Sequence, residues 1–220
     1  MNCIAHRGFA GVNPENTLDA VTAAVETGVN GIEVDVRQCA DGLVVIHDET
    51  VDRVTDASGP VSSFTVDELA DLSVCGSGAG VPTLEAVCRA VPSSVRLNLE
   101  LKERGIARET VETARAHDCD LLVSSFSAAA LSEIPDVPRA YIFYEEPDLL
   151  LKEARDLGCV AVHPHWHLCT ETFLSDARSF GFEVNAWTVN YDELVADLAE
   201  VGVDGYITDD PVYCQQSPAE

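Results

Sequence analysis

The chain has 220 residues and carries 38 acidic side chains against 13 lysines and arginines, a formal net charge of −25. A hydrophobic content of 46% supports a folded core and excludes an acidic disordered tail. The charge argues against a nucleic-acid partner or an anionic membrane surface, because both require a basic patch. No apolar run approaches the roughly 18 residues of a membrane span, so stable membrane insertion is not expected. The length fits a single domain, 1–220.

The acidic residues are spread along the chain rather than gathered in one run. Self-repulsion of this size destabilises a compact state unless salt screens it. The N-terminus also lacks the basic segment and long apolar stretch of a secretory signal. We therefore expect a cytoplasmic protein from the salt-rich cytoplasm of a halophile, and full thermal stability at very low salt would contradict this expectation.

The cysteines are scattered, and none of them forms a Cys-x-x-Cys pair. They are Cys3, Cys39, Cys75, Cys88, Cys119, Cys159, Cys169 and Cys214. Most lie in or beside apolar segments, as small buried side chains do. A reducing cytoplasm disfavours disulfides, so we expect free thiols.

Short apolar runs alternate with longer stretches of helical periodicity along the chain. The apolar runs predict strands at 2–6, 31–37, 43–47, 95–101, 121–125, 139–143, 159–163, 183–188 and 204–208. The periodic stretches predict helices at 17–27, 83–91, 105–117, 127–133, 147–157, 170–180 and 191–201, with a further short helix at 65–72. Asn16 or Thr17 is suited to cap the first helix, and Gly28 to end it.

Ala40-Asp41-Gly42 predicts a tight turn that pairs 43–47 with the second strand as a hairpin. Residues 48–82 are rich in Ser, Thr, Gly and Asp and form an excursion from the main scaffold. Without the hairpin strand, eight strands alternate with helices, which predicts a closed (β/α)8 TIM barrel with a short insertion after the second strand. The alternative is an open doubly wound sheet, but the Gly-x-Gly-x-x-Gly fingerprint after its first strand is missing.

In such a barrel, functional side chains lie at the carboxyl ends of the strands. The polar or aromatic residues near those ends are His6, Arg7, Glu33, Asp35, His47, Glu100, Lys102 and Trp187. Glu33 and Asp35 are two residues apart, so their side chains share one face of the strand. The carboxylate of Glu100 would join these two inside the barrel, where the three would repel one another. A divalent cation would relieve that repulsion. Oxygen ligands favour Mg²⁺ or Ca²⁺ over Zn²⁺.

A set of short motifs then resembles the glycerophosphodiester phosphodiesterase family, whose members form a phosphatidylinositol-phospholipase-C-like TIM barrel. The motifs are His6-Arg7-Gly8, Pro14-Glu15-Asn16-Thr17, Gly31-Ile32-Glu33-Val34-Asp35-Val36, Asp41-Gly42, His47-Asp48, Glu100-Leu101-Lys102, Trp187-Thr188-Val189-Asn190 and Asp204-Gly205-Tyr206-Ile207-Thr208-Asp209-Asp210-Pro211. Their order and approximate spacing match over about residues 2–212. Each motif alone is weak, and the ordered set is specific.

The resemblance implies an enzyme that hydrolyses glycerophosphodiesters to glycerol phosphate and an alcohol. It implies metal ligands at Glu33, Asp35 and Glu100, a general acid and base at His6 and His47, phosphate-binding cations at Arg7 and Lys102, and a substrate contact at Trp187. The metal would be Mg²⁺ or Ca²⁺, with Mn²⁺ as a further candidate. In this family the attacking group is the substrate's own glycerol hydroxyl, and water opens the resulting cyclic phosphate. The sequence does not separate a monomer from a homo-oligomer.

Several plainer interpretations stay open. Arg7 is also placed to pair with a neighbouring carboxylate, and Trp187 to pack in the core. Glu15 could act only on the helix dipole, and Asn16 only as a cap, although their loop lies at the predicted active end. A lysophospholipase D acting on lipids and a non-catalytic, metal-dependent binding barrel are the alternative functions.

The segment His163-Pro164-His165-Trp166-His167 follows the predicted strand 159–163. Alternating histidines would share one face of an extended chain, which raises the prospect of a zinc site. Pro164 and the polar surroundings favour a loop without a metal, and a contact with substrate is the third alternative.

Overall fold

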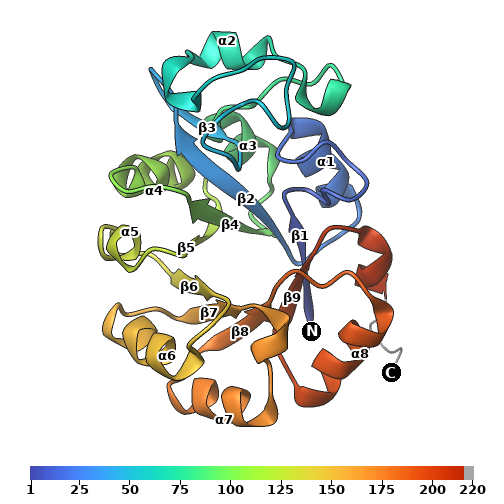
Figure 1. The fold of residues 1–220 in the computed structure, drawn as a ribbon, viewed down its shortest axis with the longest axis vertical. Coiled ribbons are helices and arrows are strands. Elements are labelled where there is room, and N and C mark those ends of the chain that lie inside the picture. Colours follow the sequence, from blue (N-terminus) through green and yellow to red (C-terminus); the bar gives the residue numbers. More distant parts are fainter. Residues whose placement is uncertain (216–220) are drawn as a thin grey trace.

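The computed structural model describes residues 1–215 and shows a closed barrel of parallel strands with helices on its outside (Figure 1). The barrel strands are β1 (Asn2–His6), β2 (Gly31–Gln38), β4 (Arg96–Leu101), β5 (Asp120–Ser125), β6 (Arg139–Phe143), β7 (Ala161–Pro164), β8 (Glu183–Ala186) and β9 (Gly205–Thr208). Neighbouring strands pair in parallel around the ring, and the pairing of β1 with both β2 and β9 closes it. The predicted (β/α)8 barrel is therefore confirmed.

The helices lie between consecutive barrel strands, as the periodicity predicts. They are α1 (Leu18–Glu26), α3 (Leu84–Ala90), α4 (Ala107–Ala116), α5 (Ala128–Ser132), α6 (Pro147–Asp156), α7 (Glu171–Ser179) and α8 (Asp192–Val201), and the 3₁₀ segment η4 (Pro211–Gln215) follows β9. Of the two residues suited to cap α1, Thr17 is the cap, and its side chain accepts from the Ala20 amide.

The alternation of side chains along each strand separates the core from the functional interior. On β2, Ile32, Val34 and Val36 are fully buried and belong to the main apolar core, which includes Val21 and Ala24 of α1. Glu33 and Asp35 occupy the alternate positions and face the opposite way. The packing of the helices onto β2 therefore fixes where these two carboxylates point.

The hairpin strand β3 (Leu43–Val45) pairs antiparallel with the outer end of β2, and Asp41-Gly42 forms the predicted turn. β3 is shorter than the predicted 43–47, so His47 lies beyond its end. The pairing of β1 with β2 ends near Glu33, whose carbonyl accepts from the Arg7 amide. Farther along β2 the hairpin takes over, beginning where the Asp35 carbonyl accepts from the Ile46 amide.

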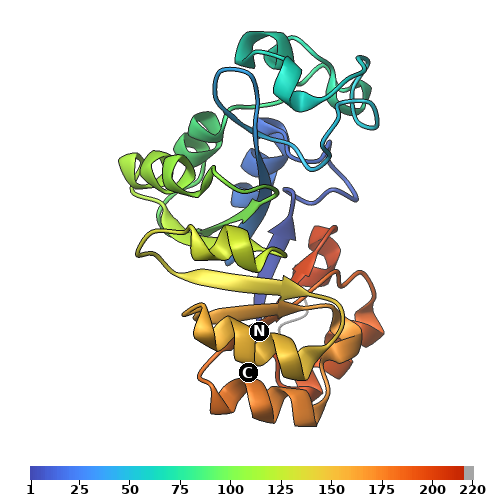
Figure 2. The same ribbon diagram turned by 60° about the vertical axis from the view of Figure 1, so that its left-hand side comes forward.

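Residues 48–82 form the predicted excursion, with helix α2 (Val66–Ala70) and the 3₁₀ segments η1 (Val61–Ser63) and η2 (Val74–Gly76). A small apolar cluster joins Val51, Val54 and Leu69 of the excursion to Val44 and Ile46 of the hairpin region. It lies at the top of the molecule in both ribbon views, far from α6 and α7 (Figure 1 and Figure 2). The excursion is therefore a packed unit at one side of the barrel.

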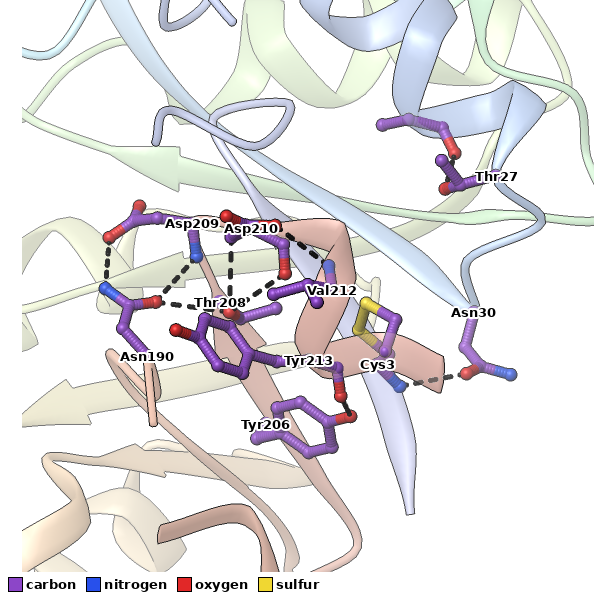
Figure 3. The surroundings of a disulfide bond; sticks show 12 residues. Cys3, Thr27, Asn30, Asn190, Tyr206, Thr208, Asp209, Asp210, Val212 and Tyr213 are labelled. Carbon is purple, nitrogen blue, oxygen red and sulfur yellow. Dashed lines mark hydrogen bonds between the residues drawn. A yellow bond between two sulfur atoms is a disulfide. The ribbon is translucent and has the colours of Figure 1, made fainter. Parts of the chain in front are cut away.

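A disulfide joins Cys3 of β1 to Cys214 of η4, with Cα atoms 5.4 Å apart (Figure 3). The expectation of free thiols is therefore wrong for these two residues. Barrel closure places β9 beside β1, and η4 then folds back toward β1, where the Tyr206 hydroxyl donates to the Tyr213 carbonyl at 2.6 Å. The remaining cysteines of the described chain are free thiols, at Cys39, Cys75, Cys88, Cys119, Cys159 and Cys169.

None of the helices within residues 1–215 is long and apolar enough to cross a membrane.

Candidate active site

Three carboxylates from two neighbouring strands meet at the carboxyl end of the barrel. Glu33, Asp35 and Glu100 each offer an oxygen, and these atoms lie within 4.8 Å of one another. All three side chains are buried. Asp35 of β2 and Glu100 of β4 are directly opposite each other in the register of these two strands, which places their carboxylates side by side. The sequence-predicted trio is therefore assembled in space.

The electrostatics of this trio show that its negative charge is poorly compensated. Burial, together with the charge of Asp35, raises the pKa of Glu33 to about 8. Burial and Asp35 also raise the pKa of Glu100. Burial would raise the pKa of Asp35 as well, but the charges of Arg7 and Lys102, with smaller contributions from His47 and Asn16, outweigh it, so that pKa is lowered. The site thus holds one firmly ionised carboxylate and two that resist ionisation.

The two predicted phosphate-binding cations both contact the carboxylates. The Nε atom of Arg7 lies 3.1 Å from Oδ2 of Asp35. The Nζ atom of Lys102 lies 2.6 Å from Oε1 of Glu100 and 3.4 Å from Oδ1 of Asp35. Arg7 therefore does pair with a carboxylate, an interpretation that the sequence left open. It also lines the pocket described below, so the pairing does not remove it from the site.

His6, at the end of β1, is held by an aspartate from the other end of the chain. Its Nδ1 atom lies 2.6 Å from Oδ1 of Asp209, and its Nε2 atom lies 3.8 Å from Oε2 of Glu33. Asn190 holds Asp209 in turn, because its amide donates to Oδ2 at 2.7 Å and accepts from the Asp209 amide at 2.9 Å (Figure 3). Burial lowers the pKa of His6, but Asp209 and Glu33 outweigh it, so the pKa is raised.

His47 has the same arrangement, with its aspartate next to it in sequence. Its Nδ1 atom lies 2.6 Å from Oδ1 of Asp48. Burial, together with the charges of Arg7 and Lys102, outweighs the nearby Asp35 and Asp48, so the pKa of His47 is lowered. In both histidines Nδ1 contacts an aspartate, and both rings line the same pocket.

The loop that carries Glu15 and Asn16 does contact the site. Oε1 of Glu15 lies 3.0 Å from Nη1 of Arg7. The Asn16 amide donates to Oδ2 of Asp35 at 2.8 Å, and its carbonyl oxygen accepts from the Asp35 amide at 3.3 Å. Asn16 therefore contacts a carboxylate of the site, and Thr17 caps the helix instead.

One pocket brings most of the predicted residues together. Its lining includes His6, Arg7, Glu33, His47, Glu100, Lys102 and Trp187, together with Asn98, Phe126, Ile142, His163, Thr188 and Ile207. Trp187 follows β8 and meets Phe126 edge to face, with ring centroids 5.4 Å apart. The pocket lining thus combines charged groups with aromatic and aliphatic ones, a composition suited to a ligand that carries both an anion and an organic group.

The three histidines after residue 162 do not form a metal cluster. His163 belongs to β7, is fully buried and lines the pocket, whereas His165 and His167 are outside it with Nδ1 atoms 2.6 Å apart. Among residues 1–215, the side chains close enough to share a metal are Glu33, Asp35 and Glu100, so nothing supports a zinc site at the histidines. The loop predicted for this segment begins after Pro164.

Three residues that contact the site were not predicted as site residues, although they lie within the family motifs: Asp48, Asp209 and Asn190. Asp209 and Asn190 are far from His6 along the chain, so only the closed barrel brings them to it. Asp48 had a usable signal, because it directly follows a candidate acid–base histidine.

The donor set fits a hard divalent cation. All the candidate ligand atoms are carboxylate oxygens, which Mg²⁺, Ca²⁺ and Mn²⁺ prefer. Within the described chain, Oε1 of Glu33 is buried and lacks a hydrogen-bond partner. A buried acceptor without a partner is costly, and a cation beside it would remove that cost.

Comparisons with known proteins identify the family of this chain. The model of the glycerophosphoryl diester phosphodiesterase family matches residues 6–213. A protein of Caldanaerobacter subterraneus named glycerophosphodiester phosphodiesterase is 31% identical over 94% of this chain and 93% of its own. An Oleispira antarctica phosphodiesterase, solved in complex with the product sn-glycerol-3-phosphate, is 31% identical with a TM-score of 0.86, covering 95% of this chain and 93% of its own.

A glycerophosphodiester phosphodiesterase from Thermotoga maritima has the same fold, with a TM-score of 0.84 at 29% identity over 95% of this chain and 94% of its own. Because the family model spans nearly the whole barrel and the relatives match over almost their full lengths, the likeness covers the site as well as the scaffold. The chain therefore belongs to the glycerophosphoryl diester phosphodiesterase family.

Proposed function

We propose that this chain hydrolyses glycerophosphodiesters to glycerol phosphate and an alcohol, with a divalent cation held by Glu33, Asp35 and Glu100. The observation that supports this most is the meeting of three buried carboxylates, two cations and two aspartate-bound imidazoles at one pocket. The names of the relatives and the sn-glycerol-3-phosphate bound to one of them point to the same chemistry.

The cation would be Mg²⁺ or Ca²⁺, with Mn²⁺ as a third candidate, because all three ligands are carboxylates. When bound, it supplies Lewis-acid stabilisation of the charge on the phosphoryl oxygens. Without it, the three carboxylates outnumber Arg7 and Lys102 by one charge, which would repel an anionic diester. With it, the sign at the site is reversed, although the chain as a whole carries −25.

The side chains divide the remaining work. Arg7 and Lys102 bind the phosphate oxygens and stabilise the charge that grows in the transition state. One imidazole of the His6 and His47 pair removes the proton from the attacking hydroxyl, and the other protonates the leaving alkoxide. Asp209 and Asp48 hold the two rings so that the Nε2 atoms face the substrate. Trp187 packs against the organic part of the diester.

The test is a cleavage assay on purified protein with Mg²⁺, Ca²⁺ or Mn²⁺ and with a chelator. Glycerophosphocholine and glycerophosphoglycerol should be cleaved with a cation and not with the chelator. A lysophospholipid in the same assay tests the lysophospholipase D alternative, which a higher rate on the lipid would favour. Failure to cleave any diester with any cation would contradict the proposed activity and leave the binding-barrel alternative.

A further inference from the structure

Arg53 is the only lysine or arginine in the excursion 48–82. Its guanidinium points back to the barrel and contacts two carboxylates at once. Nη1 and Nη2 donate to Oε2 and Oε1 of Glu15 at 2.9 and 2.7 Å, and Nε donates to Oδ2 of Asp48 at 2.5 Å. Arg53 therefore uses both edges of its guanidinium on two separate partners.

Each partner has a second contact that lies within the proposed machinery. Glu15 also accepts from Nη1 of Arg7, and Asp48 also holds Nδ1 of His47. A continuous chain of charge-assisted contacts thus runs from the phosphate-binding Arg7, through Glu15, Arg53 and Asp48, to the imidazole of His47. Such bidentate contacts fix orientation as well as charge.

The backbone of Arg53 is fixed by the packing of the excursion. Val51 and Val54 on either side of it are buried in the apolar cluster that the excursion shares with the hairpin. The Thr55 amide donates to the Val51 carbonyl, and the Cys75 amide donates to the Val54 carbonyl. The position of the guanidinium is therefore set by a packed unit outside the barrel.

The exposure of Arg53 separates a positioning role from a packing role. Its side chain is 49% exposed, whereas Glu15 and Asp48 are 14% and 26% exposed. A half-exposed ion pair contributes little to stability, so its loss should leave the fold intact. The hydrogen bond from Arg53 is also the main reason that the pKa of Asp48 falls to about 2, which keeps Asp48 ionised opposite His47.

We propose that Arg53 is a positioning residue that couples the excursion to the reaction by holding Asp48 against His47 and Glu15 against Arg7. This inference rests on the proposed function, because it assigns His47 to proton transfer. Arg7 keeps its separate contact with Asp35, so loss of Arg53 disturbs substrate binding less than proton transfer. The effect should therefore fall on kcat more than on KM.

The experiment compares Arg53→Gln with Arg96→Gln, a matched control. Arg96 is 42% exposed and also contacts two carboxylates, Asp120 and Glu183, but at the start of the barrel strands, remote from the pocket that holds His47. Arg53→Gln should lower kcat on glycerophosphocholine by about tenfold to a hundredfold with a smaller change in KM, because small misplacements of catalytic groups cost that much. Arg96→Gln should keep kcat within about twofold.

Three further tests separate a positioning role from a structural one. Arg53→Lys should recover part of kcat, since one ammonium contacts one carboxylate but not both. For Arg53→Ala, millimolar guanidinium added to the assay should restore kcat, because the site of the lost side chain is open to solvent, and the same addition should leave Arg96→Ala unchanged. Combining Arg53→Gln with Asp48→Asn should cost little more than the larger single loss, as expected for residues acting in series.

The proposal is overturned if Arg53→Gln keeps wild-type kcat, if it matches Arg96→Gln, or if its loss follows only from lower melting temperature with no rescue by guanidinium. A wild-type protein that cleaves no diester would instead contradict the proposed function.

Discussion

At the start of the barrel strands, Arg96 of β4 contacts Asp120 of β5 and Glu183 of β8 at 3.4 and 3.2 Å. At their other ends, Arg7 and Lys102 contact Asp35 at 3.1 and 3.4 Å. The residue types and distances are alike, but the environments are not. Asp120 is 50% exposed, whereas Asp35 is 1% exposed. Water stabilises charges at the first cluster, while the second needs compensation from within the protein.

This difference shows what separates an ion pair from a site. At the exposed end the ion pairs are in contact with water, and such pairs contribute little to stability. At the buried end, two carboxylates have raised pKa values beside one whose pKa is lowered. Clusters of perturbed groups in a pocket mark functional sites, and here the perturbation is what a cation would relieve.

The largest expected effect comes from neutralising a proposed metal ligand. Glu33→Gln or Glu100→Gln should lower kcat/KM on glycerophosphocholine by at least about a thousandfold. The variant loses a negatively charged metal ligand, and with it the cation and its Lewis acidity. The matched change at the exposed end, Glu183→Gln, should leave the rate nearly unchanged. Steady-state kinetics measures both variants. Equal losses of kcat/KM from the substitutions at the two ends of the barrel would contradict the assignment of the functional site to the buried end.

Replacing either proposed acid–base group should have the next largest effect. His6→Asn and His47→Asn should each lower kcat by about a hundredfold to ten thousandfold, the usual contribution of a positioned proton donor or acceptor. His117 is the control, since its Nε2 atom only approaches the exposed Glu85 at 3.7 Å. Undiminished turnover in either site variant, with melting temperature as the check on folding, would exclude that histidine from proton transfer.

Much of this arrangement was predictable, because it depends on patterns within single strands. Strand and helix alternation gave the barrel, and the spacing of Glu33 and Asp35 put them on one face. Contacts that form only when the barrel closes were not predicted, including that of Asp209 with His6 and the disulfide of Cys3 with Cys214. These pairs lie more than 200 residues apart, and no local periodicity links such positions.

A smaller effect is expected from Asp209, which orients His6 without touching the substrate. Asp209→Asn should lower kcat by about tenfold to a hundredfold, because the ring loses an ionised acceptor for Nδ1–H. KM should change less. Steady-state measurement of kcat and KM tests this role. A variant with unchanged kcat and raised KM would place Asp209 in substrate binding instead.

The smallest expected effect is a pH-dependent shift in melting temperature. Burial raises the folded pKa of Glu33 to about 8 from 4.5, so the folded state without a cation binds more protons between these pH values. Its stability therefore falls as pH rises through that window. Added Ca²⁺ or Mg²⁺ should raise the melting temperature more at pH 8 than at pH 5, while a larger gain at pH 5 would show that Glu33 is not the group involved.

The most direct measurement is calorimetric titration of the chelator-treated protein with Mg²⁺ or Ca²⁺. We expect one cation per chain and, at pH 7, release of protons on binding, since Glu33 must ionise to become a ligand. Glu33→Gln combined with Glu100→Gln should abolish binding, and Arg96→Gln should not. Wild-type protein that binds no cation, or a double variant that binds as tightly as wild type, would contradict a metal site at the three carboxylates.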